Sequence, residues 1–277
     1  AHVVPVAVST TLVVITGSLM PPLAAWALLL IGPAIALGLG LGFWEDVACR
    51  VLRGARPLTP TEVQILAPTL EVLQQQGLLT TPVEIVGHSG TSPGVHAMGE
   101  GRRTVIVSAG LLKAARDRQL PVTELAAVVA HAIGQVRTGQ VRSDLVLTYW
   151  TLPWRLACLL VNTIGHLLRP MRPVFRAGWI FVRPIVGIGA AVQATQRGYP
   201  AIGVAVIVLL LLTYAHPWAE RTWARRLVDV GDHQAAVHGL GAPLASFLRR
   251  FPPSPRSDER THRLDIATGA VRPHLAG

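Results

Sequence analysis

One segment of the sequence has the residue spacing of a metal-binding helix. Residues 131 to 135 read His131-Ala132-Ile133-Gly134-Gln135. In zinc proteases the pattern H-E-x-x-H places two imidazoles one turn apart on one helix face, and the glutamate deprotonates the zinc-bound water. Here His131 matches the first ligand, whereas Ala132 stands at the position of the base and Gln135 at that of the second ligand. Alanine cannot act as a base, and glutamine is at best a weak, neutral oxygen ligand.

The segment around this motif is predicted to be a compact α+β unit. Thr59 can cap a helix that starts at Pro60 and ends at Gly77. Apolar and β-branched runs predict the strands, and turn residues and apolar periodicity predict the remaining helices. In chain order these are a strand at 82–86, a loop rich in Gly, Ser and Pro at 87–101, a strand at 104–108, and helices at 110–118 and 122–138. The metal-helix motif falls within the last of these elements.

The composition places the rest of the chain in a membrane. Of 277 residues, 51% are hydrophobic and only 14% are charged, which is too apolar for an ordinary soluble domain. This composition excludes disorder and a collagen-like chain, and two cysteines are too few for a disulfide scaffold. Cys49 and Cys158 lie at or inside apolar stretches, so we expect both to be buried free thiols.

Apolar runs predict about four transmembrane helices. Two uncharged runs, at 3–20 and 23–44, are joined by a pair of prolines and predict a helical hairpin; a cleaved signal peptide is the alternative interpretation of the first. Further runs lie at 145–168, broken by Pro153 and Arg155, and at 199–218. Between them, 174–192 carries Arg176 and Arg183, which predicts a re-entrant or interfacial segment because a cation is costly in the bilayer. Three arginines, Arg50, Arg53 and Arg56, come directly after the second run, which predicts that this end of the span is cytoplasmic.

Three further stretches carry a family resemblance. These are Val95-His96-Ala97-Met98-Gly99, the segment Arg103 to Leu112 (RTVIVSAGLL), and Glu124 to His131, which leads into the metal-helix motif. Together with two apolar runs before the core and two after it, they resemble the HtpX-type membrane zinc metalloproteases, the family that includes the CAAX prenyl proteases. The resemblance implies a metalloprotease-like core with a peptide groove. It compares 95–99 with the family's edge-strand region and places the groove candidates at His96, Ala97, Thr104, Val105, Ile106 and Val107. The edge strand around 104–108 is the one expected to pair with an extended peptide.

The resemblance also identifies where a third zinc ligand would stand. In the family this ligand is the glutamate of an E-x-x-A-D helix beyond the last span. The matching residues here are Val228 to Asp232, so Val228 replaces the ligand and Asp232 takes the place of the family aspartate. Residues 251–255, with Glu259, Arg260 and Leu264, are similar to a degraded form of the family's C-terminal motif. A rebuilt site of His131, Asp232 and a nearby residue stays open as an alternative; the neighbours are Asp229, His233 and His238.

These patterns predict an α+β, mainly α fold in an integral membrane protein with an HtpX-like core. The first two expected parts are a transmembrane hairpin at 1–44 and a cytoplasmic core at 45–142, whose degenerate metal helix is 122–138. A membrane region follows at 143–218, and the C-terminal helix of the core and a basic tail occupy 219–277. The location that follows is the inner or plasma membrane, with the core facing the cytoplasm.

The leading functional hypothesis is a pseudoprotease that no longer hydrolyses peptides and binds, scaffolds or regulates a membrane partner. It has no catalytic residue and no cofactor, and His131, Gln135, Val228 and Asp232 are only vestigial or weak metal candidates. The alternatives are an active zinc endopeptidase with substituted ligands, which would need zinc, and a structural subunit of a membrane complex.

Arginines dominate the expected contacts with partners. Lysine and arginine exceed the acids by 25 to 15, a net charge of +10, and Lys113 is the single lysine. Arg155, Arg176 and Arg183 are interaction candidates, and the basic tail fits anionic lipid headgroups. Nucleic acid is not an expected partner, because neither an aromatic platform nor a recognition helix accompanies the arginines. Glu124 is expected to stabilise the N-terminus of its helix.

Overall fold

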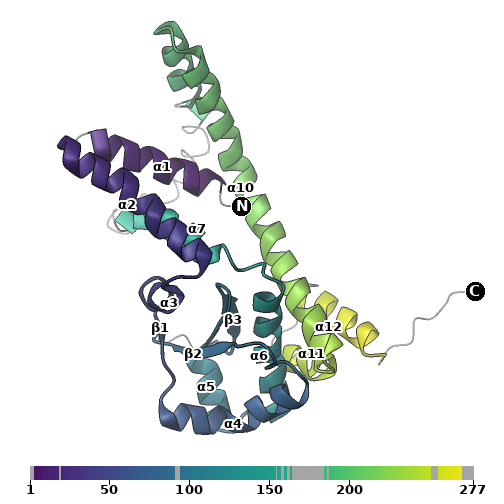
Figure 1. Ribbon diagram of the computed structural model, residues 1–277. Helices are drawn as coiled ribbons and strands as arrows, with labels where there is room; N and C mark the ends of the chain where they lie inside the picture. The colour runs from purple at the N-terminus through teal and green to yellow at the C-terminus, as the bar shows by residue number, and fades with distance from the viewer. Residues whose placement is uncertain are drawn as a thin grey trace, which may run out of the picture. The chain divides into compact units, whose positions relative to one another are not determined.

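The structure, a computed structural model, describes residues 3–18, 20–90, 94–153, 155–156, 159–160, 163, 184–185, 187–250 and 255–269. The chain divides into two compact units (Figure 1). One unit comprises residues 1–36 and 147–224, and the other comprises residues 37–146 and 225–277. Helices α2, α7 and α10 each contribute residues to both units, and the candidate site lies in the second.

The first unit is helical in its described part. It draws on α1 (Val3–Ser18), α2 (Pro22–Leu41), α7 (Asp144–Trp150) and α10 (Pro200–Val237). The indole Nε1 of Trp150 donates a hydrogen bond of 3.0 Å to Thr10 Oγ1, which joins α7 to α1. Many large apolar side chains of these helices are exposed, including Leu23 and Trp26 of α2. Such surfaces are typical of contact with lipid or with another protein.

The expectation of about four transmembrane helices is wrong. Within the described residues, α2 is the one helix long and apolar enough to cross a bilayer; a second is added if the two parts of α10, Pro200–Leu212 and Tyr214–Val237, which are bent by 46°, count as one span. Helix α1 has 16 residues, which rise about 24 Å, less than the bilayer core of about 30 Å. The third apolar run contains the short helix α7, and beyond Trp150 only some of its residues are described. Most of 174–192 also lies outside the described residues.

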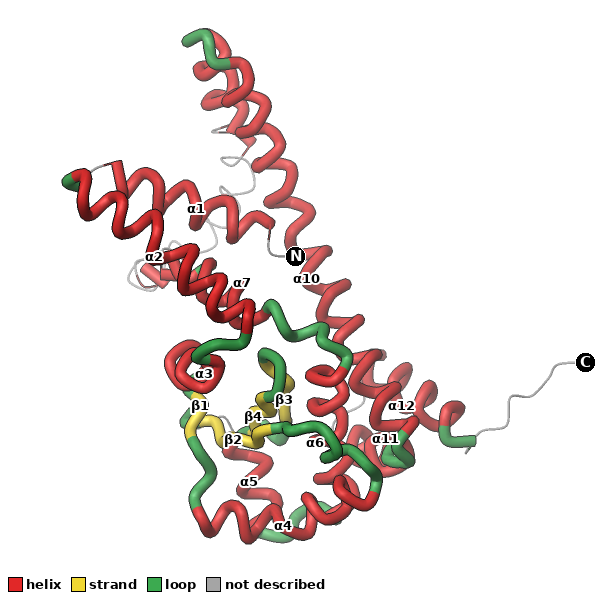
Figure 2. Tube along the Cα trace, viewed as in Figure 1, coloured by secondary structure: helices red, strands yellow, loops and turns green. Residues whose placement is uncertain are grey.

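The second unit contains a small mixed sheet with the order β1-β2-β4-β3 (Figure 2). Strands β1 (Ala55–Arg56) and β2 (Glu84–His88) are antiparallel, β2 and β4 (Thr104–Val107) are parallel, and β3 (Ala97–Glu100) and β4 are antiparallel. The prediction that 104–108 forms the edge strand is therefore wrong, because β4 pairs on both sides. The edge strand is β3. Residue types placed it within the loop at 87–101, whereas the family resemblance had compared 95–99 with the family's edge-strand region.

Helices pack on this sheet from several segments of the chain. Helix α4 (Pro60–Gln75) begins after the N-cap residue Thr59, as the sequence predicted, and Glu62 completes a capping box with it. The remaining helices of the unit are α3 (Glu45–Arg53), α5 (Ala109–Arg116), α6 (Val122–Arg137), α11 (Gly241–Arg249) and α12 (Pro255–Ala267). Helix α6 contacts β3, β4, α4 and α11, which explains why it is apolar on nearly all sides and buried along most of its length.

Candidate functional site

Helices α6 and α10 approach each other closely at two glycines. A Cβ atom on Gly231 would lie 2.5 Å from His131 Nδ1, and one on Gly134 would lie 2.6 Å from the Cβ of Gln234. Any larger side chain at either position would therefore push the helices apart. The close approach brings His131 of α6 next to Asp232 of α10.

Gln135 links the metal-helix motif to the edge strand. Its Nε2 lies 3.1 Å from His131 Nε2 and 3.4 Å from the carbonyl oxygen of Leu227. Its Oε1 accepts a hydrogen bond of 3.1 Å from the backbone N–H of Gly99 in β3. Because the carboxamide nitrogen is a donor, this arrangement assigns the acceptor role to His131 Nε2 and the proton to Nδ1.

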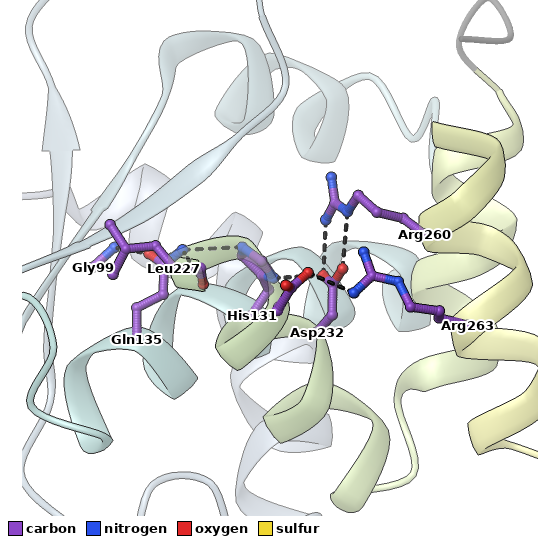
Figure 3. A network of polar contacts seen from close by, with 8 residues as sticks. Gly99, His131, Gln135, Leu227, Asp232, Arg260 and Arg263 are labelled. Carbon is purple, nitrogen blue, oxygen red and sulfur yellow. Dashed lines mark hydrogen bonds and ion pairs between the residues drawn. The ribbon is translucent and has the colours of Figure 1, made fainter. Parts of the chain in front are cut away.

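Asp232 lies on the other side of His131 and is paired with an arginine (Figure 3). Arg260 of α12 donates from Nε and from a terminal nitrogen to its two oxygens, at 2.9 and 2.8 Å. His131 Nδ1 is 2.9 Å from Asp232 Oδ1, although the contact lacks the alignment of a good hydrogen bond. Burial alone would raise the pKa of Asp232, but the Arg260 guanidinium and His131 outweigh it, and the pKa is lowered.

The structure thus brings three of the four metal-site candidates into one polar network. His131, Gln135 and Asp232 belong to it, whereas Val228 is half-buried one turn before Asp232 and contributes no polar atom. Ala132 is fully buried, and its carbonyl oxygen lies only 2.7 Å from where a Cβ on Gly99 would sit. The network is therefore bounded by backbone of β3 on one side and by Arg260 on the other.

A rebuilt metal site is not assembled by the residues that the structure describes. No group of three or more His, Cys, Asp or Glu side chains among them converges on one point. His233 lines a cavity of about 210 Å³ with Asp229 and Asp232, but Asp229 pairs with Arg263 at 2.7 Å. His238 Nδ1 instead lies 2.9 Å from the carbonyl oxygen of Gln76. The donor set present does not fit tetrahedral zinc, which needs three protein ligands and an open position.

The predicted groove residues separate into two groups. Thr104, Val105, Ile106 and Val107 are buried in β4, and neither edge of that strand is free. His96 is exposed before β3, and Ala97 is half-buried within it. Any extended peptide that added to this sheet through β3 would meet Gly99, whose N–H is already bonded to Gln135.

Other predicted residues have structural roles or lie outside the described part. Buried Glu124 accepts hydrogen bonds from Ser246 and from Arg250, so it ties α6 to α11 in addition to lying in the first turn of α6. Cys49 is buried, and burial raises the pKa of its thiol to about 12. Arg155 is exposed, whereas Arg176, Arg183 and Cys158 lie outside the described residues.

The sequence did not identify two parts of the network. Arg260 was singled out only as the arginine of the family's C-terminal motif, and that resemblance did not identify it as the partner of Asp232. The role of Gly99 as a donor to Gln135 was also missed, because it depends on the placement of β3 against α6. The one available signal was the glycine itself, which often marks a close approach of backbone.

Comparison with known proteins adds no relative. No family model, no curated protein and no solved structure matches the chain.

Proposed function

We propose that this chain is an HtpX-like membrane protein in which a hydrogen-bond network replaces the metal site. It does not hydrolyse peptides; it binds, scaffolds or regulates a membrane partner. The observation that carries the proposal is the position of Gln135 between His131 and Gly99.

Gln135 opposes metal binding in two ways. It directs N–H donors at His131 Nε2, the ring nitrogen whose lone pair a metal would need. Its oxygen, the only metal ligand it could offer, already accepts from Gly99 N–H. Turning the amide over would leave that buried backbone donor without its partner, at a cost of about 1–3 kcal/mol.

The charges around the network also disfavour a cation. Arg260 neutralises Asp232 with two hydrogen bonds and remains three-quarters buried beside it. A divalent ion at His131 would meet this guanidinium within the same polar cluster, where like charges repel strongly. Ala132, finally, offers no group that could take a proton from water.

The membrane part of the proposal is supported by α2. This helix of 20 residues carries no charge and exposes apolar side chains along its length. A helix of that length matches the hydrocarbon core of a bilayer. We propose the plasma or inner membrane as the location, with the core unit on the cytoplasmic face, where Arg50, Arg53 and Arg56 follow the span.

A proteolysis assay tests the proposal. Purified full-length protein in detergent is incubated with fluorescein-labelled casein, with and without added zinc, beside a zinc endopeptidase that proves the assay works. We expect no release of labelled peptides above that of the His131→Ala variant. Cleavage that needs zinc, stops with a chelator and disappears in His131→Ala would overturn the proposal in favour of an active endopeptidase.

A further inference from the structure

Helix α3 exposes a row of large apolar side chains. Trp44, Val47 and Val51 are 63%, 55% and 75% exposed, and Phe43 in the preceding turn is 61% exposed. Val47 and Val51 are four residues apart and share one face of α3 (Glu45–Arg53), and Trp44 and Phe43 lie directly before the helix. We call these four residues the α3 face. A folded core rarely leaves such a stripe in water without a use for it.

The opposite side of α3 is fixed to the core. Buried Glu45 accepts hydrogen bonds from the backbone N–H groups of Arg102 and Arg103, at 2.9 and 3.1 Å, and from Thr104 Oγ1 at 2.9 Å. Cys49, one turn later, is also buried. Because these contacts set the rotation of the helix, α3 cannot turn to bury its apolar face.

Specific contacts hold the turn between α2 and α3. Trp44 has φ 56°, a left-handed conformation that costs about 1–2 kcal/mol in a residue other than glycine. Its ring packs over Gly38 of α2, where a Cβ would come within 2.8 Å of the indole. Arg102 donates 2.7 Å to the carbonyl oxygen of Gly40, near the C-terminus of α2. The α3 face therefore begins directly where the apolar helix ends.

We infer that the α3 face lies in the headgroup region of the bilayer that α2 crosses. The inference goes beyond the proposed pseudoprotease function, and it rests on the membrane placement of α2. Tryptophan favours this layer because its ring is apolar and its N–H is polar, and an amphipathic helix buries its apolar side at the same depth. Exposed Arg50 on α3 supplies a cation for lipid phosphates.

Continuity with α2 selects lipid over a protein partner. Phe43 and Trp44 follow α2 without an intervening polar residue, since only Gly42 separates Leu41 from Phe43. Among the described residues, α2 is the one helix that is long and apolar enough to cross a bilayer by itself. A surface for a second copy or another protein would not need to begin where this helix ends.

Spin labels measure this placement. The full chain with Cys158→Ala is reconstituted into phosphatidylcholine nanodiscs, with a label attached at Val47→Cys or Val51→Cys. Buried Cys49 is retained, and the parent without an added cysteine reports any background labelling. The matched control is Val63→Cys, because Val63 is a 46% exposed valine on α4 of the same unit.

The two labels on α3 are expected to be more accessible to oxygen and less accessible to a water-soluble nickel chelate than the Val63→Cys label. The oxygen-to-nickel ratio should be several-fold higher. Ratios equal to that of Val63→Cys would overturn the inference, as would low accessibility to both reagents, which indicates a protein cover. Failure of the chain to enter nanodiscs would overturn both this inference and the membrane placement of α2. The proposed lack of proteolytic activity would still be tested by the separate casein assay.

Discussion

Gln135 combines two tasks at a position where a zinc protease would have a histidine. It satisfies a backbone donor of the edge strand and it holds the ring of His131, so α6, β3 and α10 meet at one side chain. A side chain that is only 8% exposed and makes three polar contacts should matter to folding.

We expect Gln135→Ala to lower the free energy of unfolding by about 1–3 kcal/mol, because Gly99 N–H would stay buried without an acceptor. Urea unfolding of the detergent-solubilised protein measures the change. Gln74→Ala is the matched control, since Gln74 is exposed on α4 and its removal should change little. Equal stability of the two variants would mean that Gln135 does not hold the strand.

Glu62 makes a pH-dependent contribution to stability. Hydrogen bonds from Arg56, at 2.6 and 2.8 Å, are the main cause that lowers the pKa of Glu62 from 4.5 to about 2. A carboxyl with a lowered folded-state pKa stabilises the protein above its unfolded pKa and loses that contribution as the pH falls through the folded pKa.

The stability advantage of the parent over Glu62→Gln should therefore be full above about pH 4.5 and shrink as the pH falls to about 2. Thermal unfolding across this pH range measures it. An advantage that stays constant over the range would show that the carboxylate charge of Glu62 is not what stabilises the start of α4.

The crossing of α6 and α10 depends on glycine at the contact. In Gly231→Ala, the new methyl group would lie 2.8 Å from the carbonyl oxygen of His131 and 2.5 Å from its ring. Overpacking of this kind should destabilise the fold by about 1–3 kcal/mol. Gly32→Ala in α2 is the control, because nothing lies within 4 Å of its added Cβ and alanine is the better helix former.

The comparison is made by the urea midpoint of each variant in the same detergent. A Gly231→Ala midpoint at or above that of the parent would mean that the two helices are not in close contact at this glycine.

Local sequence signals predicted single helices well, but they predicted the contacts between distant segments poorly. Thr59 and Glu62 define the start of α4, and the predicted helix 122–138 differs from α6 by one residue at its end. Residue types predicted a loop where β3 lies, because a strand of four residues that includes Gly99 gives too weak a β signal. The order of strands depends on contacts between distant segments, so the sequence could not show that β4 lies inside the sheet.

The site follows the same division. The motif spacing singled out His131 and Gln135, and one helical turn related Val228 to Asp232. Which arginine pairs with Asp232, and which backbone N–H meets Gln135, are set by tertiary packing of α12 and β3 on α6 and α10. Hydropathy likewise overcounted the spans, since an apolar run carries no information on where a helix breaks.

At the scale of the whole molecule, the proposed attachment to a membrane depends on one or two candidate spans among the described residues. We expect the full-length chain to remain in the membrane pellet after an alkaline carbonate wash and to be released by detergent, because the apolar surface of α2 cannot be accommodated in water. The fractions are followed by immunoblotting beside a peripheral protein. Release of the chain by carbonate alone would contradict a membrane-spanning α2.

We propose that the hydrogen bonds around His131 take the place of a bound metal ion. Elemental analysis of the detergent-purified full-length protein for zinc and other transition metals tests it directly, with His131→Ala as the control. We predict no metal above the background of the variant, because Gln135 occupies Nε2 of His131 and Arg260 pairs with Asp232. A near-stoichiometric metal that disappears in His131→Ala would contradict the account.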